Sequence, residues 1–335
     1  MSQAQTTASH AYQRWDGDLG RGWWTWRAIV WNGLKLAIKQ QRNKNLLLLS
    51  VAFTLMIGLT LYVIRLLEDV MGTSQASGLM DFIRTFMGVD LSGLREIGEY
   101  REALWRTLFL VIVKMQQWWV VLVVAFVGPG LIANDIKSRA LPIYFAKPVT
   151  PATYIFGKWM VVAVFIGAVT FIPNLGGLLL GIIITGGLET WSQVLSLAAD
   201  LAVSGLGQTV LAGMLILALS SLTSDQRYVS VGWIAVHVLP PVVQRIVEEM
   251  VELDRLRGLL GSLSIYRDVI VLNDWLFNVR QIWSATLLPD EVFDRAIVPP
   301  TGLFYPAVVL GTITVGAIAL CYWRVVRFSR AAANM

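Results

Sequence analysis

The stretch Gly128–Trp159, GPGLIANDIKSRALPIYFAKPVTPATYIFGKW, is a polar, turn-rich insert between two strongly apolar regions. A connection of roughly 26 residues between two membrane spans is longer than a tight turn requires. Ser138 or Thr150 can cap a helix, and Pro151 suits the first turn of one. The insert therefore predicts one or two short helices at the membrane surface that present both charged and aromatic side chains.

The composition indicates a polytopic membrane protein. Of 335 residues, 56% are hydrophobic and only 15% are charged, whereas about a quarter of a soluble domain is charged. Cys321 is the only cysteine, so a disulfide framework within the chain is excluded. The two histidines, His10 and His237, are too far apart in sequence to suggest a metal site. We therefore expect neither a metal nor a catalytic centre in this chain.

Six apolar runs approach the roughly 20 residues that a helix needs to cross a bilayer. They predict an all-α fold with six transmembrane helices near residues 46–67, 108–132, 159–185, 197–222, 228–247 and 304–323. Pro173, with a glycine pair after it, is expected to interrupt the third run, and Pro240-Pro241 to break the fifth just after His237. Residues 1–45, 46–323 and 324–335 then form an N-terminal segment, a transmembrane domain and a tail.

The distribution of charge predicts the orientation. The ends of the chain, the insert and the short turn near 223–227 hold 15 basic and 4 acidic residues, against 12 basic and 18 acidic elsewhere. Basic residues favour the cytoplasmic side, so we expect a multi-pass plasma-membrane protein with both termini in the cytoplasm. The charged residues behind the net charge of +5 are distributed according to the predicted spans and form no single basic face. This distribution argues against nucleic acid as a partner.

Four further charges lie near the predicted outer ends of spans: Arg65, Lys114, Asp200 and Arg245. Long side chains at such positions reach water by snorkelling. Asp200 is short, and is therefore the best candidate among them for a role in transport.

An amphipathic helix is predicted ahead of the first span, in WWTWRAIVWNGLKLAIKQQRNK (residues 23–44). Its apolar side chains recur at steps of three and four residues, and its basic side chains fall on a separate arc. This pattern favours a helix in the cytoplasmic interface, held by anionic lipid, with Trp23, Trp26, Lys35 and Lys39 as its anchor. The alternative is a soluble helix packed against a partner.

Two amphipathic stretches are associated with the outer segment 248–303. The first, VVQRIVEEMVELDRLRGLL (residues 242–260), begins shortly before it, and the second is SIYRDVIVLNDWLFNVRQIW (residues 264–283). They can lie on the outer leaflet, enter it partway as a re-entrant pair, or cap the pore. The sequence leaves these three arrangements open.

The insert resembles the membrane subunits of type-2 ABC transporters. The matching residues are Asp135, Arg139-Ala140, Leu141-Pro142, Lys147-Pro148-Val149, Tyr154 and Gly157-Lys158. In that family the loop, residues 133–158 here, forms a coupling helix that seats in a groove of the ATPase subunit. The resemblance implies that a set of insert residues couples to the ATPase: Asp135, Lys137, Arg139, Leu141, Pro142, Lys147, Pro148, Tyr154 and Lys158. Asn134-Asp135-Ile136-Lys137 departs from the family, many of whose members have a denser run of Glu and Arg.

The resemblance also implies the partners. These are two copies of a separate ABC ATPase subunit, which bind ATP and Mg²⁺, and a second membrane subunit that is the same chain or a homologous one. No G-x-x-x-x-G-K-[ST] phosphate loop occurs in the sequence, so ATP must bind to another chain. We therefore expect no cofactor here.

The resemblance thus implies the permease subunit of an ATP-driven exporter. Its substrate is unknown, and the small number of inner polar groups favours an amphipathic molecule over a small ion. The candidates for its translocation path are Asn174, Asp200, His237, Pro240 and Pro241. Two alternatives remain. One is a membrane anchor of a larger complex that transports nothing. The other is an intramembrane serine protease using Ser204 and His237 as a nucleophile–base pair.

Overall fold

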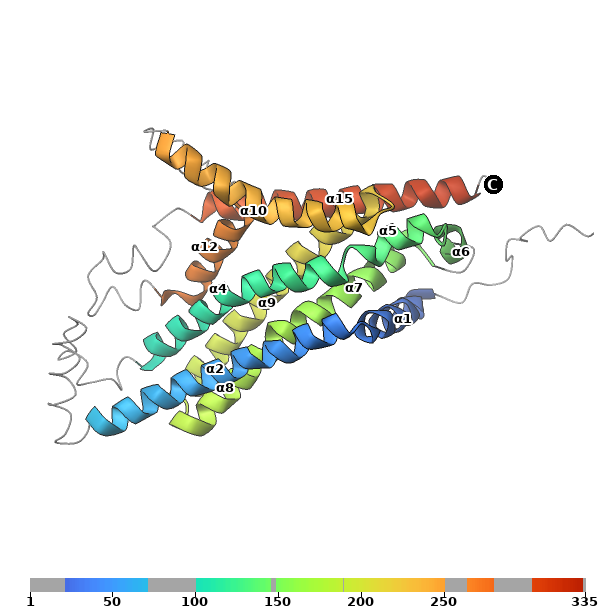
Figure 1. The fold of residues 1–335 in the computed structure, drawn as a ribbon. Helices are drawn as coiled ribbons and strands as arrows, with labels where there is room; N and C mark the ends of the chain where they lie inside the picture. Colours follow the sequence, from blue (N-terminus) through green and yellow to red (C-terminus); the bar gives the residue numbers. More distant parts are fainter. Residues whose placement is uncertain are drawn as a thin grey trace, which may run out of the picture.

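The structure, a computed structural model, describes residues 22–71, 101–145, 149–188, 190–250, 264–279 and 303–333, and every regular element in these ranges is a helix. In chain order the elements are η1 (Gly22–Thr25), α1 (Trp26–Lys39), α2 (Gln41–Met71), α4 (Arg101–Val127), α5 (Gly130–Lys137), α6 (Leu141–Phe145), α7 (Pro151–Val169), α8 (Phe171–Thr185), α9 (Trp191–Leu222), α10 (Gln226–Met250), α12 (Ile265–Phe277) and α15 (Phe304–Ala333). Figure 1 shows the long helices side by side in one bundle, with α1, α5, α6 and the C-terminal end of α15 at the same end. This end is called the α5–α6 end.

Five segments in the described part of the chain are long and apolar enough to cross a membrane: Gln41–Leu66, Arg101–Lys137, Pro151–Thr185, Trp191–Leu222 and Phe304–Ser329. They contain five of the six predicted spans. The remaining predicted span, 228–247, lies in α10, which is not among them. In α10 the side chains of residues 244, 245 and 247–250 lie outside the described residues.

Prolines explain two of the breaks along the chain. Proline cannot donate a backbone hydrogen bond, and its ring clashes with the carbonyl four residues earlier. Accordingly α7 ends at Val169, four residues before Pro173, and α8 begins at Phe171, so the predicted interruption of the third span is confirmed. Likewise α4 ends at Val127 and α5 begins directly after Pro129.

The predicted break at Pro240-Pro241 is wrong, because α10 is helical from Gln226 to Met250 with both prolines inside it. Neighbouring helices and local bending allow a proline within a membrane helix. Figure 1 shows α10 changing direction along its length.

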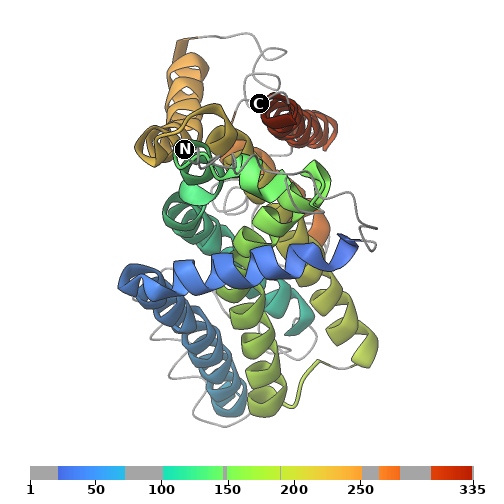
Figure 2. The same ribbon diagram turned by 90° about the vertical axis from the view of Figure 1, so that its right-hand side faces the viewer.

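The predicted amphipathic helix is confirmed up to Lys39 as η1 and α1, which Figure 2 shows lying across the long helices, whereas residues 41–44 already belong to α2. Glycines let it approach α7 closely. A Cβ built on Gly33 would lie 2.5 Å from Val161 Cγ2, and one on Gly157 would lie 3.0 Å from Ile29 Cβ. Ile29 and Ala37 are its buried side chains.

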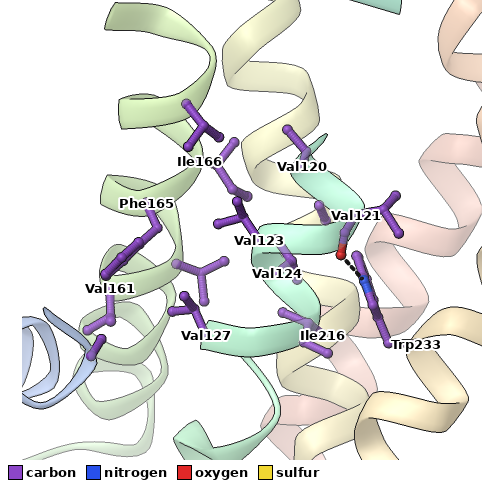
Figure 3. Close-up of a cluster of buried hydrophobic side chains, with 14 of the residues drawn as sticks. Val120, Val121, Val123, Val124, Val127, Val161, Phe165, Ile166, Ile216 and Trp233 are labelled. Atoms are coloured by element: carbon purple, nitrogen blue, oxygen red, sulfur yellow. Dashed lines mark hydrogen bonds between the residues drawn. The ribbon is translucent and has the colours of Figure 1, made fainter. Parts of the chain in front are cut away.

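The middle of the bundle is filled by β-branched and aromatic side chains from α4, α7, α9 and α10 (Figure 3). Trp233 of α10 is fully buried there, and its indole Nε1–H donates to the carbonyl of Val121 at 2.8 Å. In lipid such a core stabilises through van der Waals contact and hydrogen bonds between helices, because lipid tails are as apolar as the side chains.

α12, which belongs to the predicted outer segment, packs inside the bundle against α4, α9 and α15. At its start the carbonyl of Tyr266 accepts from Gln117 Nε2 at 3.2 Å, and at its end the carbonyl of Phe277 accepts from Arg106 Nη1 at 3.3 Å. α12 therefore runs antiparallel to the first half of α4, from mid-bundle to the end opposite α5 and α6. Residues 251–263 and 280–302 of the outer segment lie outside the described residues.

Candidate functional site

The α4–α5 junction is held by serines of two neighbouring helices. Ser220 of α9, fully buried, accepts from the backbone N–H groups of Ile132 and Ala133 at 3.1 and 3.0 Å and donates to the carbonyl of Pro129 at 2.7 Å. Ser230 of α10 donates to the carbonyl of Ala125 at 3.3 Å, which Pro129 leaves without its usual helical donor. The serine side chains of α9 and α10 thus supply hydrogen-bond partners for the backbone groups that the break between α4 and α5 leaves unpaired.

An ion pair joins α5 to α7. Asp135 Oδ2 lies 2.7 Å from Lys158 Nζ and accepts the hydroxyl of Tyr154 at 2.6 Å. Tyr154 and Lys158 stand one helical turn apart, on the face of α7 that meets α5. The side chains of Asp135 and Lys158 are only 16% and 10% exposed. We call these three residues the α5–α7 lock.

Aromatic rings from α6 surround the lock. The ring centres of Tyr144 and Phe145 lie 5.3 and 5.9 Å from that of Tyr154, and Lys158 Nζ lies 5.8 Å from the centre of the Tyr144 ring. Burial, with a further contribution from the Asp135 charge, raises the pKa of Tyr144 above its ordinary value. Tyr144 therefore stays a neutral phenol next to the ion pair.

The base of α6 packs on α15. Leu141 is buried in one apolar cluster with Ile132, Tyr154, Cys321 and Val325. α6 is therefore in direct contact with α15 as well as with α5 and α7.

α5 ends in a Schellman motif with arginine at its left-handed position. Arg139 has φ 53°, its N–H donates to Ile136, and the N–H of Ala140 donates to Asp135 O at 2.9 Å. Glycine is preferred there, since a side chain in this conformation costs about 1 kcal/mol. Arg139 is exposed, as are Lys137, Pro142 and Ile143. We call these four residues the tip.

The predicted coupling residues thus divide into two groups. Lys137, Arg139 and Pro142 are exposed at the tip, whereas Leu141, Tyr154, Lys158 and Asp135 lie wholly or partly inside the α5–α6 end. Asp135 is occupied by partners within its own chain. Lys147 and Pro148 lie outside the described residues. Thr150 caps α7 and Pro151 begins it, as expected. Ser138 instead ends α5 and donates to the carbonyl of Asn134.

The candidate path residues lie at separate places in the bundle. Asn174 exchanges two amide hydrogen bonds of 3.0 Å with Gln116 inside the α4–α8 contact. Asp200 pairs with Arg106 at 2.7 Å near the opposite end, and His237 faces α4 and α9 from α10. Pro240 and Pro241 are partly exposed within α10. The structure does not gather these residues into one channel.

The geometry also separates the two proposed protease residues. The hydroxyl of Ser204 donates to Asn273 Oδ1 at 2.7 Å, and His237 Nδ1 lies 2.9 Å from the carbonyl of Trp233. Ser204 and His237 therefore form hydrogen bonds with other groups and do not make a nucleophile–base pair.

The predicted interfacial anchor is partly described. Trp26 packs edge-on against Phe156 of α7 at 5.4 Å between ring centres. Lys35 and Lys39 are exposed, with Lys35 Nζ 5.1 Å from the centre of the Trp31 ring. The side chain of Trp23 lies outside the described residues.

Replacing Ser220 with alanine is expected to lower the free energy of unfolding by about 1–3 kcal/mol, because two buried N–H groups lose their acceptor. Ser221→Ala is the matched control, since Ser221 is equally buried but donates only to the carbonyl of Ala218 in its own helix. Thermal unfolding of the detergent-purified variants measures both. Equal losses in the two would contradict the role given to Ser220.

No protein-family model matches the chain, and no curated protein matches it either.

Proposed function

We propose that this chain is the permease subunit of an ATP-driven exporter similar to type-2 ABC transporters, and that its tip docks on a separate ATPase subunit. The observation that carries the proposal is an exposed tip braced from behind by the α5–α7 lock. A surface that receives a push from a motor must be rigid and must pass the displacement to spans. Here α5 continues α4, the lock holds α7, and α6 packs on α15.

The conformation of Arg139 supports the choice of docking surface. An arginine at the left-handed position of the motif reduces stability relative to glycine. Its exposed guanidinium beside Lys137 and Ile143 gives the tip charge and apolar surface together, which suits a groove on a protein partner.

The proposal includes six transmembrane helices in this chain and a dimer of two membrane subunits. α9 and α15 both end at the α5–α6 end, where Arg324 Nε donates to the backbone carbonyl of Ser221, in the last turn of α9, at 3.2 Å. The chain between α9 and α15 must therefore return toward the opposite end. α10 begins beside α5, and it is the helix that makes this crossing in the proposal. Only 22% of the apolar membrane-spanning stretch is buried in α2, and the same share in α15. Both helices therefore have surface left for lipid or for a second subunit. The excess of basic residues supports a cytoplasmic α5–α6 end in this proposal.

Arg139 provides a test that separates docking from folding. Arg139→Gly is expected to maintain or raise the unfolding temperature, because it relieves the strained backbone, and yet to weaken capture of an ATPase in co-purification. Arg139→Glu should weaken capture further. Arg327→Glu, an exposed charge change at the same end, serves as the control.

Three outcomes would count against the proposal. They are capture of no ATPase by the wild-type chain, equal capture by all three variants, or an Arg327→Glu defect as large as that of Arg139→Glu. Capture without ATP-dependent movement of any solute in reconstituted vesicles would instead identify the chain as an anchor.

A further inference from the structure

A small cavity lies inside the bundle where α4, α9, α10 and α12 meet. Its volume is about 30 Å³, and most of its lining is apolar. Three polar side chains also line it: Gln117, Gln208 and His237, each no more than 7% exposed. Polar groups buried this deeply are costly unless they are hydrogen-bonded.

The orientation of the Gln117 amide is fixed by α12. Its Nε2 donates to the carbonyl of Tyr266 at 3.2 Å. Turning the amide over would place its oxygen against that carbonyl, and two acceptors cannot bond each other. Gln117 Oε1 is therefore an acceptor, and it has no hydrogen-bond partner among the described residues.

The tautomer of His237 is fixed in the same way. Its Nδ1 lies 2.9 Å from the carbonyl of Trp233, which can only accept, so Nδ1 carries the proton. In the neutral ring Nε2 is then a second acceptor. The ring packs against Trp233 with 4.1 Å between ring centres, which holds it in this orientation.

Gln208 adds a third polar group, an amide whose Oε1 is buried and has no partner in the described part of the chain. Polar side chains from three helices thus line the cavity, and two of them offer an acceptor to a small molecule that donates hydrogen bonds. Water is the smallest donor of two hydrogen bonds, and a cavity of this size accommodates one or two water molecules.

We propose that this cavity is a built water site that links α10 to α4 and α9 through His237, Gln117 and Gln208. It lies one turn before Pro240, where α10 lacks two backbone donors. The bound water fastens α10 to the rest of the bundle just where the helix is easiest to bend. The inference depends on no ATPase partner and stands or falls separately from the proposed function.

The chain offers a clean reporter, because its histidines are only His10 and His237. In a His10→Ala background, ¹⁵N-histidine labelling gives signals from His237 alone. Solid-state NMR of the protein in phosphatidylcholine–phosphatidylglycerol vesicles then measures the tautomer and the transfer of magnetisation from water. The expected result is a proton on Nδ1, a hydrogen-bonded and unprotonated Nε2, and rapid transfer from water.

Gln117→Met removes one acceptor at similar side-chain length and is expected to abolish that transfer. Gln208→Met removes another and should do the same, so the test survives if either variant folds poorly. Val238→Leu, on the exposed side of α10 next to His237, should leave the transfer unchanged. A proton on Nε2, transfer undiminished in both glutamine variants, or an Nε2 signal that changes on exchanging Na⁺ for K⁺ would overturn the proposal.

Discussion

Replacing Arg106 with leucine is expected to lower the free energy of unfolding by about 3 kcal/mol, because it leaves two partly buried carboxylates without their counter-charge. The Arg106 guanidinium, 9% exposed, lies 2.8 Å from Glu102 Oε1 and 2.7 Å from Asp200 Oδ2. It also donates to Ser196 and to the carbonyl of Phe277. One side chain thus joins α4, α9 and α12 at the end opposite α5 and α6. Unfolding of the purified protein by heat or denaturant measures the effect.

Arg65→Leu provides the matched control, since Arg65 pairs with Asp69 at 3.3 Å while their side chains are 42% and 59% exposed. Exposed pairs contribute about 0–1 kcal/mol. Adding Asp200→Asn to Arg106→Leu should recover part of the loss, because it removes one of the stranded charges. If Arg106→Leu were no more destabilising than Arg65→Leu, the ion pairs and hydrogen bonds of Arg106 would not be what holds α12 in the bundle.

Much of the helical framework is predictable from sequence because its signals are local. Apolar length predicts five of the membrane helices, and the spacing of tryptophans and lysines predicts α1. Thr150 with Pro151 predicts a helix start, but the helix that begins there is α7, which continues into the span, and not a separate short helix. Each of these features depends on residues within a few turns of one another. The same holds for the break that Pro173 introduces between α7 and α8.

Features that depend on contacts between helices were predicted poorly. Pro240 and Pro241 lie within a continuous α10, held by Trp233 and Ser230 in contacts that no local pattern reveals. Asp200 was considered for a transport role, whereas its partner Arg106 was not singled out. The only local signal was Glu102, one turn before Arg106.

In the loop of residues 133–158, the sequence also did not predict which single side chains are buried and which are exposed. Nothing in the local sequence separates Asp135 and Lys158, which face each other, from Lys137 and Arg139, which are exposed. The division arises because α7 brings Lys158 back beside α5 and because the left-handed Arg139 turns the chain away. Both depend on the assembled α5–α6 end.

Lys158→Met is expected to abolish stimulation of the partner's ATP hydrolysis while the ATPase is still captured. This expectation rests on the proposed function. The substitution removes the cation that neutralises Asp135 and leaves the Tyr154 hydroxyl as the remaining member of the lock. Breaking such a buried pair costs about 3 kcal/mol, which loosens α5 from α7. The tip can then still dock, but its displacement no longer reaches the spans.

Lys137→Met is the matched control, because it removes an exposed lysine of α5 only two residues after Asp135 of the lock. It should weaken capture and leave the free energy of unfolding nearly unchanged, the reverse of Lys158→Met. Adding Asp135→Asn to Lys158→Met should restore most of the stability, since asparagine is neutral and still accepts from Tyr154. Measurements of capture, hydrolysis rate and unfolding on the three variants separate the two roles. Should Lys158→Met leave both stability and coupling intact, displacement of the tip must reach the membrane by another route than the α5–α7 lock.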